Sequence, residues 1–464
     1  MTIFSLLALL ATAQTTALVG GTIVDGTGAG GIANGVVVVA GDRIACVGTA
    51  EHCPVPADAV RMDVTGRWLT PGLVDAHVHY SQTGWIDGRP DGISAPDLYP
   101  YAATSRALRA HPARWHRSYL CSGITAVYDV GGHPWTTGLA AATERDPQAP
   151  HVRAAGPLVT HATRAALRVD DEHYTFLPMD SDAEANASVA RLVAMGAQAV
   201  KVWYLAPQAA RRGELDARVM AIGAAARAAG LPLIVHATGL REAKVALRAG
   251  ATMLVHSVED QAVDQEFLDL LLANQATYAP TLTVGGNWTR ALASIALNVV
   301  YQPDDPNGCV DRETMAKLMN LAPLQPLLPE RLRNPEVHFR NLENAGAERA
   351  VMAANLRQVQ AAGGRVVAAT DAGNPLTLHG PSIYGEVEAM ERAGLPAATV
   401  LVLATRNGAE AMGRLADFGT LEVGKIADLL VLAEDPQRST RAFRSLTHVM
   451  RAGQLHTQES LRAR

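Results

Sequence analysis

The sequence predicts an α/β protein: a (β/α)8 TIM-type barrel with a small β-sandwich domain built from both chain ends. From Leu73 onward, apolar strands alternate with alanine-rich helical stretches, which is typical of βα units around a parallel sheet. Residues 17–70 instead contain short β-branched runs broken by glycine, and this texture returns after about Phe418. We therefore expect the two ends of the chain to form one small domain beside the barrel.

The central region contains eight strand candidates, the number that a (β/α)8 barrel needs. Helical stretches between them end in glycine at Gly230 and Gly250, the residue that helix ends favour. The strand candidates are residues 73–79, 124–130, 151–159, 199–204, 231–237, 251–257, 276–282 and 365–373.

Four segments follow from this pattern: an N-terminal segment over 1–16, the first stretch of the β-domain over 17–70, the barrel over 71–415, and the second stretch of the β-domain over 416–464. Within the barrel, residues 287–345 carry "PDDPNG" and "LAPLQPLLPERLRNP" and are longer than a connecting loop needs. This excursion is compatible with a lid over the barrel mouth and equally with a peripheral decoration.

Composition and charge favour a small-molecule ligand. The 464 residues are 48% hydrophobic, and 40 basic against 45 acidic residues give a formal net charge of −5. No basic surface for nucleic acid or an anionic membrane is indicated. The sequence leaves the oligomeric state open, a homo-oligomer included.

The first residues, "MTIFSLLALLATA", resemble a secretory signal peptide, although no basic residue precedes the apolar run. We expect export to the periplasm or the medium, and a cytoplasmic protein if this segment is instead a buried strand or follows a misassigned start. The run is too short for a stable membrane span.

Four cysteines are too few for a disulfide-built scaffold, and none has a C-x-x-C spacing. Cys46 and Cys53 lie close enough in sequence to form a bridge in an oxidising compartment, and two free thiols fit equally well.

The residue types at the strand ends carry the chemistry. In "DAHVHY", His77 and His79 face the same side of a strand because side chains alternate, so both can bind one metal ion. Parallel strands of a barrel deliver their carboxyl ends to one face. A histidine or lysine at a single strand end usually has an ordinary structural role, but so many together indicate a site. The convergent set is His77, His79, Lys201, His236, His256 and Asp371.

With "TPGLVDAHVH", "KVW", "IVHATG", "LVHSVED" and "AATDAGNP", the chain resembles the metal-dependent amidohydrolase superfamily. The resemblance covers nearly the whole chain and implies two divalent ions, zinc above all, bridged by a carboxylated lysine. The implied ligands are His77, His79 and Asp371 for the more buried ion, His236 and His256 for the more exposed ion, and carboxylated Lys201 between them.

This resemblance implies hydrolysis of an amide, peptide or ester bond of a small molecule. A metal-bridging hydroxide would attack a carbonyl, and Asp371 would act as general acid and base. The closest subgroup is imidazolonepropionase-like and includes prolidase-like dipeptidases, which makes a dipeptidase the favoured interpretation. The chain departs from that subgroup in "YLAPQAARRGE" after strand four and in "VTH" after strand three, where substrate would bind.

Three further residues near the barrel mouth, His161, Arg164 and Tyr204, are candidate substrate contacts, although such side chains are often only solvated. Three alternatives remain open for the protein as a whole. They are a mononuclear deaminase-like amidohydrolase, a lactone or phosphotriester hydrolase, and a non-catalytic scaffold.

Overall fold

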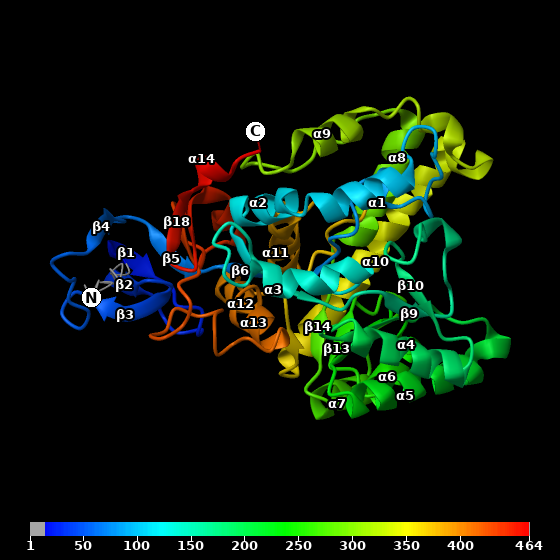
Figure 1. Ribbon diagram of the computed structural model, residues 1–464, viewed down its shortest axis with the longest axis horizontal. Coiled ribbons are helices and arrows are strands. Elements are labelled where there is room, and N and C mark those ends of the chain that lie inside the picture. Colours follow the sequence, from blue (N-terminus) through cyan, green and yellow to red (C-terminus); the bar gives the residue numbers. More distant parts are fainter. Residues whose placement is uncertain (1–13, 464) are drawn as a thin grey trace, which may run out of the picture.

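The computed structural model describes residues 14–463 and contains a β-rich region beside a larger α/β region (Figure 1). Most of the N-terminal segment over 1–16, which resembles a signal peptide, lies outside the described residues. Only residues 14–16 are described, and strand β1 begins at Thr15. No helix among the residues described is long and apolar enough to cross a membrane.

Both chain ends contribute strands to one mixed eight-stranded sheet, as the sequence predicts. Strand β5 joins the two ends, because it pairs with β1 on one side and with β16 on the other. The order is β18-β17-β16-β5-β1-β2-β3, with β4 also paired to β1. The second layer of the expected sandwich stays a prediction. The strands are β1 (Thr15–Ile23), β2 (Ile32–Ala40), β3 (Arg43–Thr49), β4 (Val60–Asp63), β5 (Trp68–Pro71), β16 (Leu429–Leu432), β17 (Leu446–Arg451) and β18 (Gln454–Thr457).

The central region forms two parallel sheets, ordered β6-β7-β8 and β10-β9-β11-β12-β13-β14-β15. Main-chain hydrogen bonds link the two sheets at two places, from Ala76 N to Ala368 O (3.0 Å) and from Gln198 N, just before β11, to Ala154 O (2.9 Å). This is a TIM-barrel-type α/β arrangement. The strands are β6 (Leu73–Val78), β7 (Ile124–Asp129), β8 (His151–Ala154), β9 (Leu158–Thr160), β10 (Phe176–Pro178), β11 (Val200–Trp203), β12 (Leu233–His236), β13 (Met253–Val255), β14 (Thr277–Ala279) and β15 (Arg365–Val366).

Two predicted strands differ from the structure. The strand expected over 151–159 divides into β8 and β9, because Gly156 adopts a left-handed φ of +68° and Pro157 cannot donate to a ladder. The strand expected over 365–373 is regular only over β15. Beyond it, Thr370 N donates to the carboxylate of Asp75 at 3.0 Å instead of to a neighbouring main chain.

Helices follow most strands and cover the outside of the parallel sheets (Figure 1). They are α1 (Tyr101–Ala110), α2 (Ala113–Cys121), α3 (Leu139–Thr143), α4 (Asp182–Ala194), α5 (Arg212–Ala228), α6 (Leu240–Arg248), α7 (Gln265–Ala273), α8 (Val284–Leu297), α9 (Arg312–Met319), α10 (Pro335–Ala361), α11 (Ser382–Arg392), α12 (Ala397–Leu403), α13 (Arg406–Ala411) and α14 (Gln458–Leu461).

The excursion packs against the loop that follows β6. Trp85 and Ile86 of that loop share one apolar cluster with Ala291 and Ile295 of α8 and with Leu318 of α9. Burying such side chains contributes about 1.5–3 kcal/mol each. The cluster therefore holds the excursion beside the carboxyl end of β6.

All four cysteines are paired in the structure. Cys46 and Cys53 form the bridge that the sequence left open, with Cα atoms 5.7 Å apart. Cys121 and Cys309, 188 residues apart, form a second bridge that the sequence did not predict. It joins the end of α2 to the segment before α9, so the excursion is covalently attached to the α/β region.

A buried ion network ties the terminal sheet to the barrel. Asp428 lies just before β16, and its Oδ2 is 3.0 Å from Nε2 of His151, the first residue of β8. Arg451, at the end of β17, is fully buried, with Nη1 3.7 Å from Asp428 Oδ1. Burial raises the pKa of Asp428, but the charges of His151 and Arg451 lower it more, so the carboxylate stays ionised.

Replacing Asp428 with Asn removes this charge while keeping the side chain's shape. We expect the free energy of unfolding to fall by about 3–5 kcal/mol, because the buried guanidinium of Arg451 loses its counter-charge. Urea denaturation followed by circular dichroism measures the change. The matched control is Asp171→Asn, whose exposed pair with Arg168 should contribute less than about 1 kcal/mol. Equal effects of the two substitutions would contradict the role of the network.

Candidate active site

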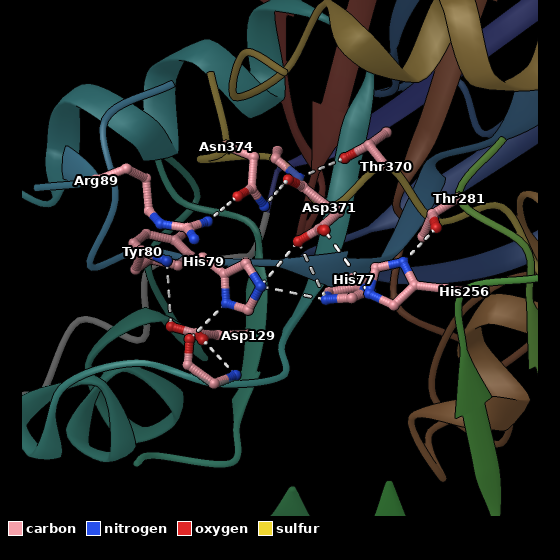
Figure 2. Close-up of polar contacts among 12 residues, drawn as sticks. His77, His79, Tyr80, Arg89, Asp129, His256, Thr281, Thr370, Asp371 and Asn374 are labelled. Carbon is pink, nitrogen blue, oxygen red and sulfur yellow. Dashed lines mark hydrogen bonds and ion pairs between the residues drawn. The ribbon is translucent and has the colours of Figure 1, made fainter. Parts of the chain in front are cut away.

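The first and last strands of the parallel sheets bring three predicted metal ligands together. His77 and His79 come from the end of β6, and Asp371 follows β15. Two main-chain bonds fix this register: Asp371 N donates to His77 O at 2.8 Å, and His79 N donates to Ala372 O at 2.8 Å. The alternation of strand side chains then turns both imidazoles toward the carboxylate, as Figure 2 shows.

The donor atoms of this group have the spacing of ligands around one ion. Oδ1 of Asp371 lies 2.8 Å from His79 Nε2 and 3.3 Å from His77 Nε2, and the two nitrogens are 3.2 Å apart. Tetrahedral ligands at the zinc–nitrogen distance are about 3.3 Å from one another. The three side chains are buried and could hold a divalent metal ion.

The tautomer of His79 supports a cation at this point. Its Nδ1 lies 2.5 Å from the carbonyl oxygen of Gly131, which can only accept a hydrogen bond, so Nδ1 carries the proton. In the neutral imidazole Nε2 then presents a lone pair to the carboxylate of Asp371 at 2.8 Å. Two lone pairs so close repel unless a proton or a metal ion lies between them. The residues therefore fit a metal ion.

Asp129 fixes the carbonyl that orients His79. Its carboxylate accepts from Gly131 N at 3.1 Å and from Tyr80 N at 3.3 Å (Figure 2). Asp129 is fully buried at the end of β7. Burial raises its pKa to about 6, although the charge of His79 opposes the rise. The chain of contacts from Asp129 through Gly131 to His79 sets the direction of one metal-facing nitrogen.

His236 and His256 stand beside this group at the ends of β12 and β13. Their ring centroids are 4.4 Å apart, and that of His256 is 5.2 Å from that of His77. His256 Nδ1 is 2.6 Å from Thr281 Oγ1, and its Nε2 is 3.9 Å from Asp371 Oδ2 (Figure 2). The structure thus brings all four predicted histidines to one place.

Backbone strain is concentrated at the same strand ends. His256, Thr281 and Asp371 all adopt left-handed φ angles, of +74°, +45° and +64° respectively. Each costs of order 1–3 kcal/mol in a residue other than glycine. Such strain is characteristic of functional sites, where the surrounding structure imposes the position of a side chain.

Lys201 on β11 is only 1% exposed and lines the same cavity. Burial lowers the pKa of its amine to about 7, and the carboxylate of Asp371 offsets only some of this. Burial at this position therefore favours the uncharged amine.

Asp371 itself stays ionised. Burial raises its pKa, but the hydrogen bond and charge of His79 and the charges of His256 and Lys201 lower it more, so that the net pKa lies below the usual value. An ionised carboxylate among imidazoles is suited to binding a cation and to accepting a proton.

These side chains face a cavity of about 270 Å³. Aromatic and apolar groups from several elements form much of its wall, and the excursion contributes Trp288 and Ala345. Beyond the predicted ligands, the cavity carries further charged and polar groups that the sequence did not single out. They are Gln82, Arg89, Thr175, Thr238, Glu259, Thr281, Glu348, Arg349 and Asn374.

The three predicted substrate contacts do not line this cavity. Tyr204 is buried and donates to Asp216, while His161 packs near Tyr204 with ring centroids 6.1 Å apart. Arg164 lies over the ring of Trp203 at 5.6 Å, and Trp203 does line the cavity. A role in substrate binding stays a prediction for all three.

Sequence reasoning missed residues that support the ligands. Asp75 occupies the same strand face as His77 and His79, two residues earlier, so the period of two could have revealed it. Burial raises its pKa to about 7, and it accepts from Thr370 N and Oγ1, at 3.0 Å and 2.6 Å. Asn374 joins the site to the excursion, because its Oδ1 accepts from Arg89 and from Trp288 Nε1. No local signal identifies that partnership.

The fold is of the TIM-barrel type, and its strand ends bring together histidines and a carboxylate that could hold a divalent metal ion. Residues 68–455 match the model of the amidohydrolase family. The chain belongs to this family, which confirms the resemblance and the expectation that it is an amidohydrolase.

Comparison with individual proteins gives partial and distant matches. The chain is 27% identical over 266 residues to an imidazolonepropionase of Methylobacterium sp. (strain 4-46), covering 49% of this chain and 60% of the relative. It is 47% identical over 51 residues to an imidazolonepropionase of Bradyrhizobium diazoefficiens, covering 11% and 13%. The chain thus matches less than two thirds of the length of these curated relatives.

Solved structures show the shared fold over nearly the full length. A Xaa-Pro dipeptidase with bound methionine in the active site superposes with a TM-score of 0.71 at 20% identity, covering 96% of this chain and all of that one. A putative prolidase from Bifidobacterium longum gives 0.68 at 24% identity, covering 96% and 95%.

Thr281→Val tests the contact that orients His256. Valine keeps the shape and β-branching of threonine but cannot bond to Nδ1, so we expect metal affinity at His256 to fall by about 10- to 100-fold. Competition for Zn²⁺ with a chromophoric chelator measures the affinity. Thr277→Val on β14, a buried position outside the cavity, is the control and should leave it unchanged. Unchanged affinity in Thr281→Val would show that the contact does not support a ligand.

Proposed function

We propose that the protein is a metal-dependent hydrolase that cleaves an amide or peptide bond of a small molecule, with a dipeptide as the favoured substrate. The observation that carries this proposal is the convergence of His77, His79 and Asp371 with the other predicted ligands on one cavity. The names of the related proteins, imidazolonepropionase and Xaa-Pro dipeptidase, support it.

The donor set suits two zinc ions. His77, His79 and Asp371 would hold the first, and His236 and His256 the second, since imidazole and carboxylate are common zinc ligands. Lys201 would bridge them after carboxylation. Its uncharged amine forms a bond to the carbon of CO2 and releases a proton, which leaves a carbamate with two oxygens and a negative charge. The lowered pKa of Lys201 supports this step.

Divalent ions, when bound, lower the pKa of water and polarise the substrate carbonyl. The side chains of the site transfer the proton and position the reacting groups. Asp371 accepts the proton of the attacking water on a carboxylate oxygen and delivers it to the nitrogen of the departing amine. The apolar wall of the cavity excludes bulk water, and His79, fixed by Gly131, keeps the carboxylate of Asp371 in place.

Cavity size and lining favour a small substrate. A volume of about 270 Å³ is near the lower end for small-molecule sites. Aromatic groups such as Trp203 and Phe176 offer surfaces for an apolar side chain, and Arg349 offers positive charge. This combination suits a short peptide or a related amide.

A panel of dipeptides, cyclic amides, esters, lactones and phosphotriesters first identifies the best substrate. For that substrate, Asp371→Asn should lower kcat by about 10²- to 10⁴-fold, because the asparagine side chain cannot accept the proton. Metal content, measured by elemental analysis, should remain largely in place. Asp91→Asn, next to the cavity but paired with Arg89, is a control for changes in local charge. Full activity of Asp371→Asn would remove the assigned role.

Metal stoichiometry tests the two-ion centre. We expect about two zinc ions per chain in metal-replete protein and a clear loss on Lys201→Ala, since the bridge is gone. Chelator treatment should abolish turnover, and added Zn²⁺ should restore it. A single ion that is insensitive to Lys201→Ala would favour a mononuclear deaminase, and a chain that binds no zinc would favour a scaffold.

A further inference from the structure

A second cavity lies beside the reaction cavity and is lined by residues of α8, α10 and α11. Its volume is about 570 Å³, large enough for a small organic molecule. Leu282 and Arg349 line both cavities, so the two share a wall. Much of the rest is apolar and includes Tyr301, Ala350, Ala353, Leu376 and Leu378.

Two arginines of this lining, Arg290 and Arg349, lie close together where the second cavity adjoins the reaction cavity. A Cβ atom placed on Gly286, a residue that lines the reaction cavity, would lie 3.6 Å from Arg349 Nη1 and 3.9 Å from Arg290 Nη1. Both guanidinium groups donate hydrogen bonds to neutral oxygens. Arg290 donates to Asn287 Oδ1 at 3.0 Å, and Arg349 donates to Ala345 O at 3.1 Å. Within residues 14–463, neither guanidinium has a carboxylate within 4 Å.

The two carboxylates of this cavity are paired with two other arginines, Arg444 and Arg392. Asp304 and Glu388 both line it, and both pair with Arg444, at 2.6 Å and 2.5 Å. Arg392, the remaining arginine of the lining, lies 3.5 Å from Glu388 and is 65% exposed. The uncompensated positive charge therefore resides in the two arginines that lie close together.

We propose that this second cavity binds a small anion with an apolar body. Arg290 and Arg349 bind the anionic group, since guanidinium forms strong charge-assisted hydrogen bonds with carboxylates and related oxyanions. The apolar wall holds the body of the ligand. Because Arg349 also faces the reaction cavity, an occupant of the second cavity contacts a residue of the first. This site does not depend on the proposed hydrolysis.

A matched pair of fluorescent probes tests the site on the intact protein. 8-Anilinonaphthalene-1-sulfonate has an apolar body and an anionic group, and N-phenyl-1-naphthylamine has the same body without the charge. We expect the sulfonate to bind at one site and to lose about 10-fold or more in affinity in Arg290→Met and in Arg349→Met, as losing a charge-assisted hydrogen bond implies. Binding of the neutral probe should change by less than about twofold.

Two further variants test whether the probes bind in this cavity and whether the loss of any arginine charge lowers binding. Arg392→Met, which removes a paired and exposed charge, should leave both probes unaffected. Gly385→Leu should abolish binding of both, because a Cβ on Gly385 meets no atom within 4 Å and extends into the cavity. Sulfonate binding that resists Gly385→Leu, or that is equal in both Arg→Met variants and the parent, would overturn the proposal. Circular dichroism confirms that each variant is folded.

Discussion

The closure of the first parallel strand against the last is the constraint on which the site depends. Main-chain bonds between Asp371 N and His77 O and between His79 N and Ala372 O set the register of these two segments. If the pairing of these two segments shifted by one residue, both imidazoles would point away from the carboxylate. Asp75 reinforces this pairing, because its carboxylate replaces a main-chain partner for Thr370. The strain at Asp371 is the cost of directing its side chain to the histidines.

Burial changes both the pKa values of the site residues and the electrostatic interactions among them. The same desolvation that lowers the pKa of Lys201 to about 7 also places Nε2 of His77 and Nε2 of His79 within 3.3 Å of an oxygen of the ionised Asp371 carboxylate. A cation bound among these groups would give the buried carboxylate a counter-charge. Binding of a divalent ion would therefore be coupled to the order of the strand ends.

The convergence of the six predicted side chains could be foreseen from the sequence, because each lies at the end of a local apolar run and a parallel sheet gathers such ends at one edge. The pairing of both chain ends in one sheet followed from strand texture in the same way. Contacts set by distant segments could not be predicted. Trp288 meets Asn374 across 86 residues, and Cys121 pairs with Cys309 across 188. No sequence pattern indicated where the side chains of His161 and Arg164 would point.

The excursion contributes to the walls of both cavities. Like the barrel, it lies within the family match, and α8 and α10 supply residues to both cavities. Trp288 contacts the site through Asn374, and the Cys121–Cys309 bridge and the apolar cluster around Trp85 hold the excursion against the barrel. A wall held at three places is a defined surface. The position of this wall is therefore set by contacts outside the parallel sheets.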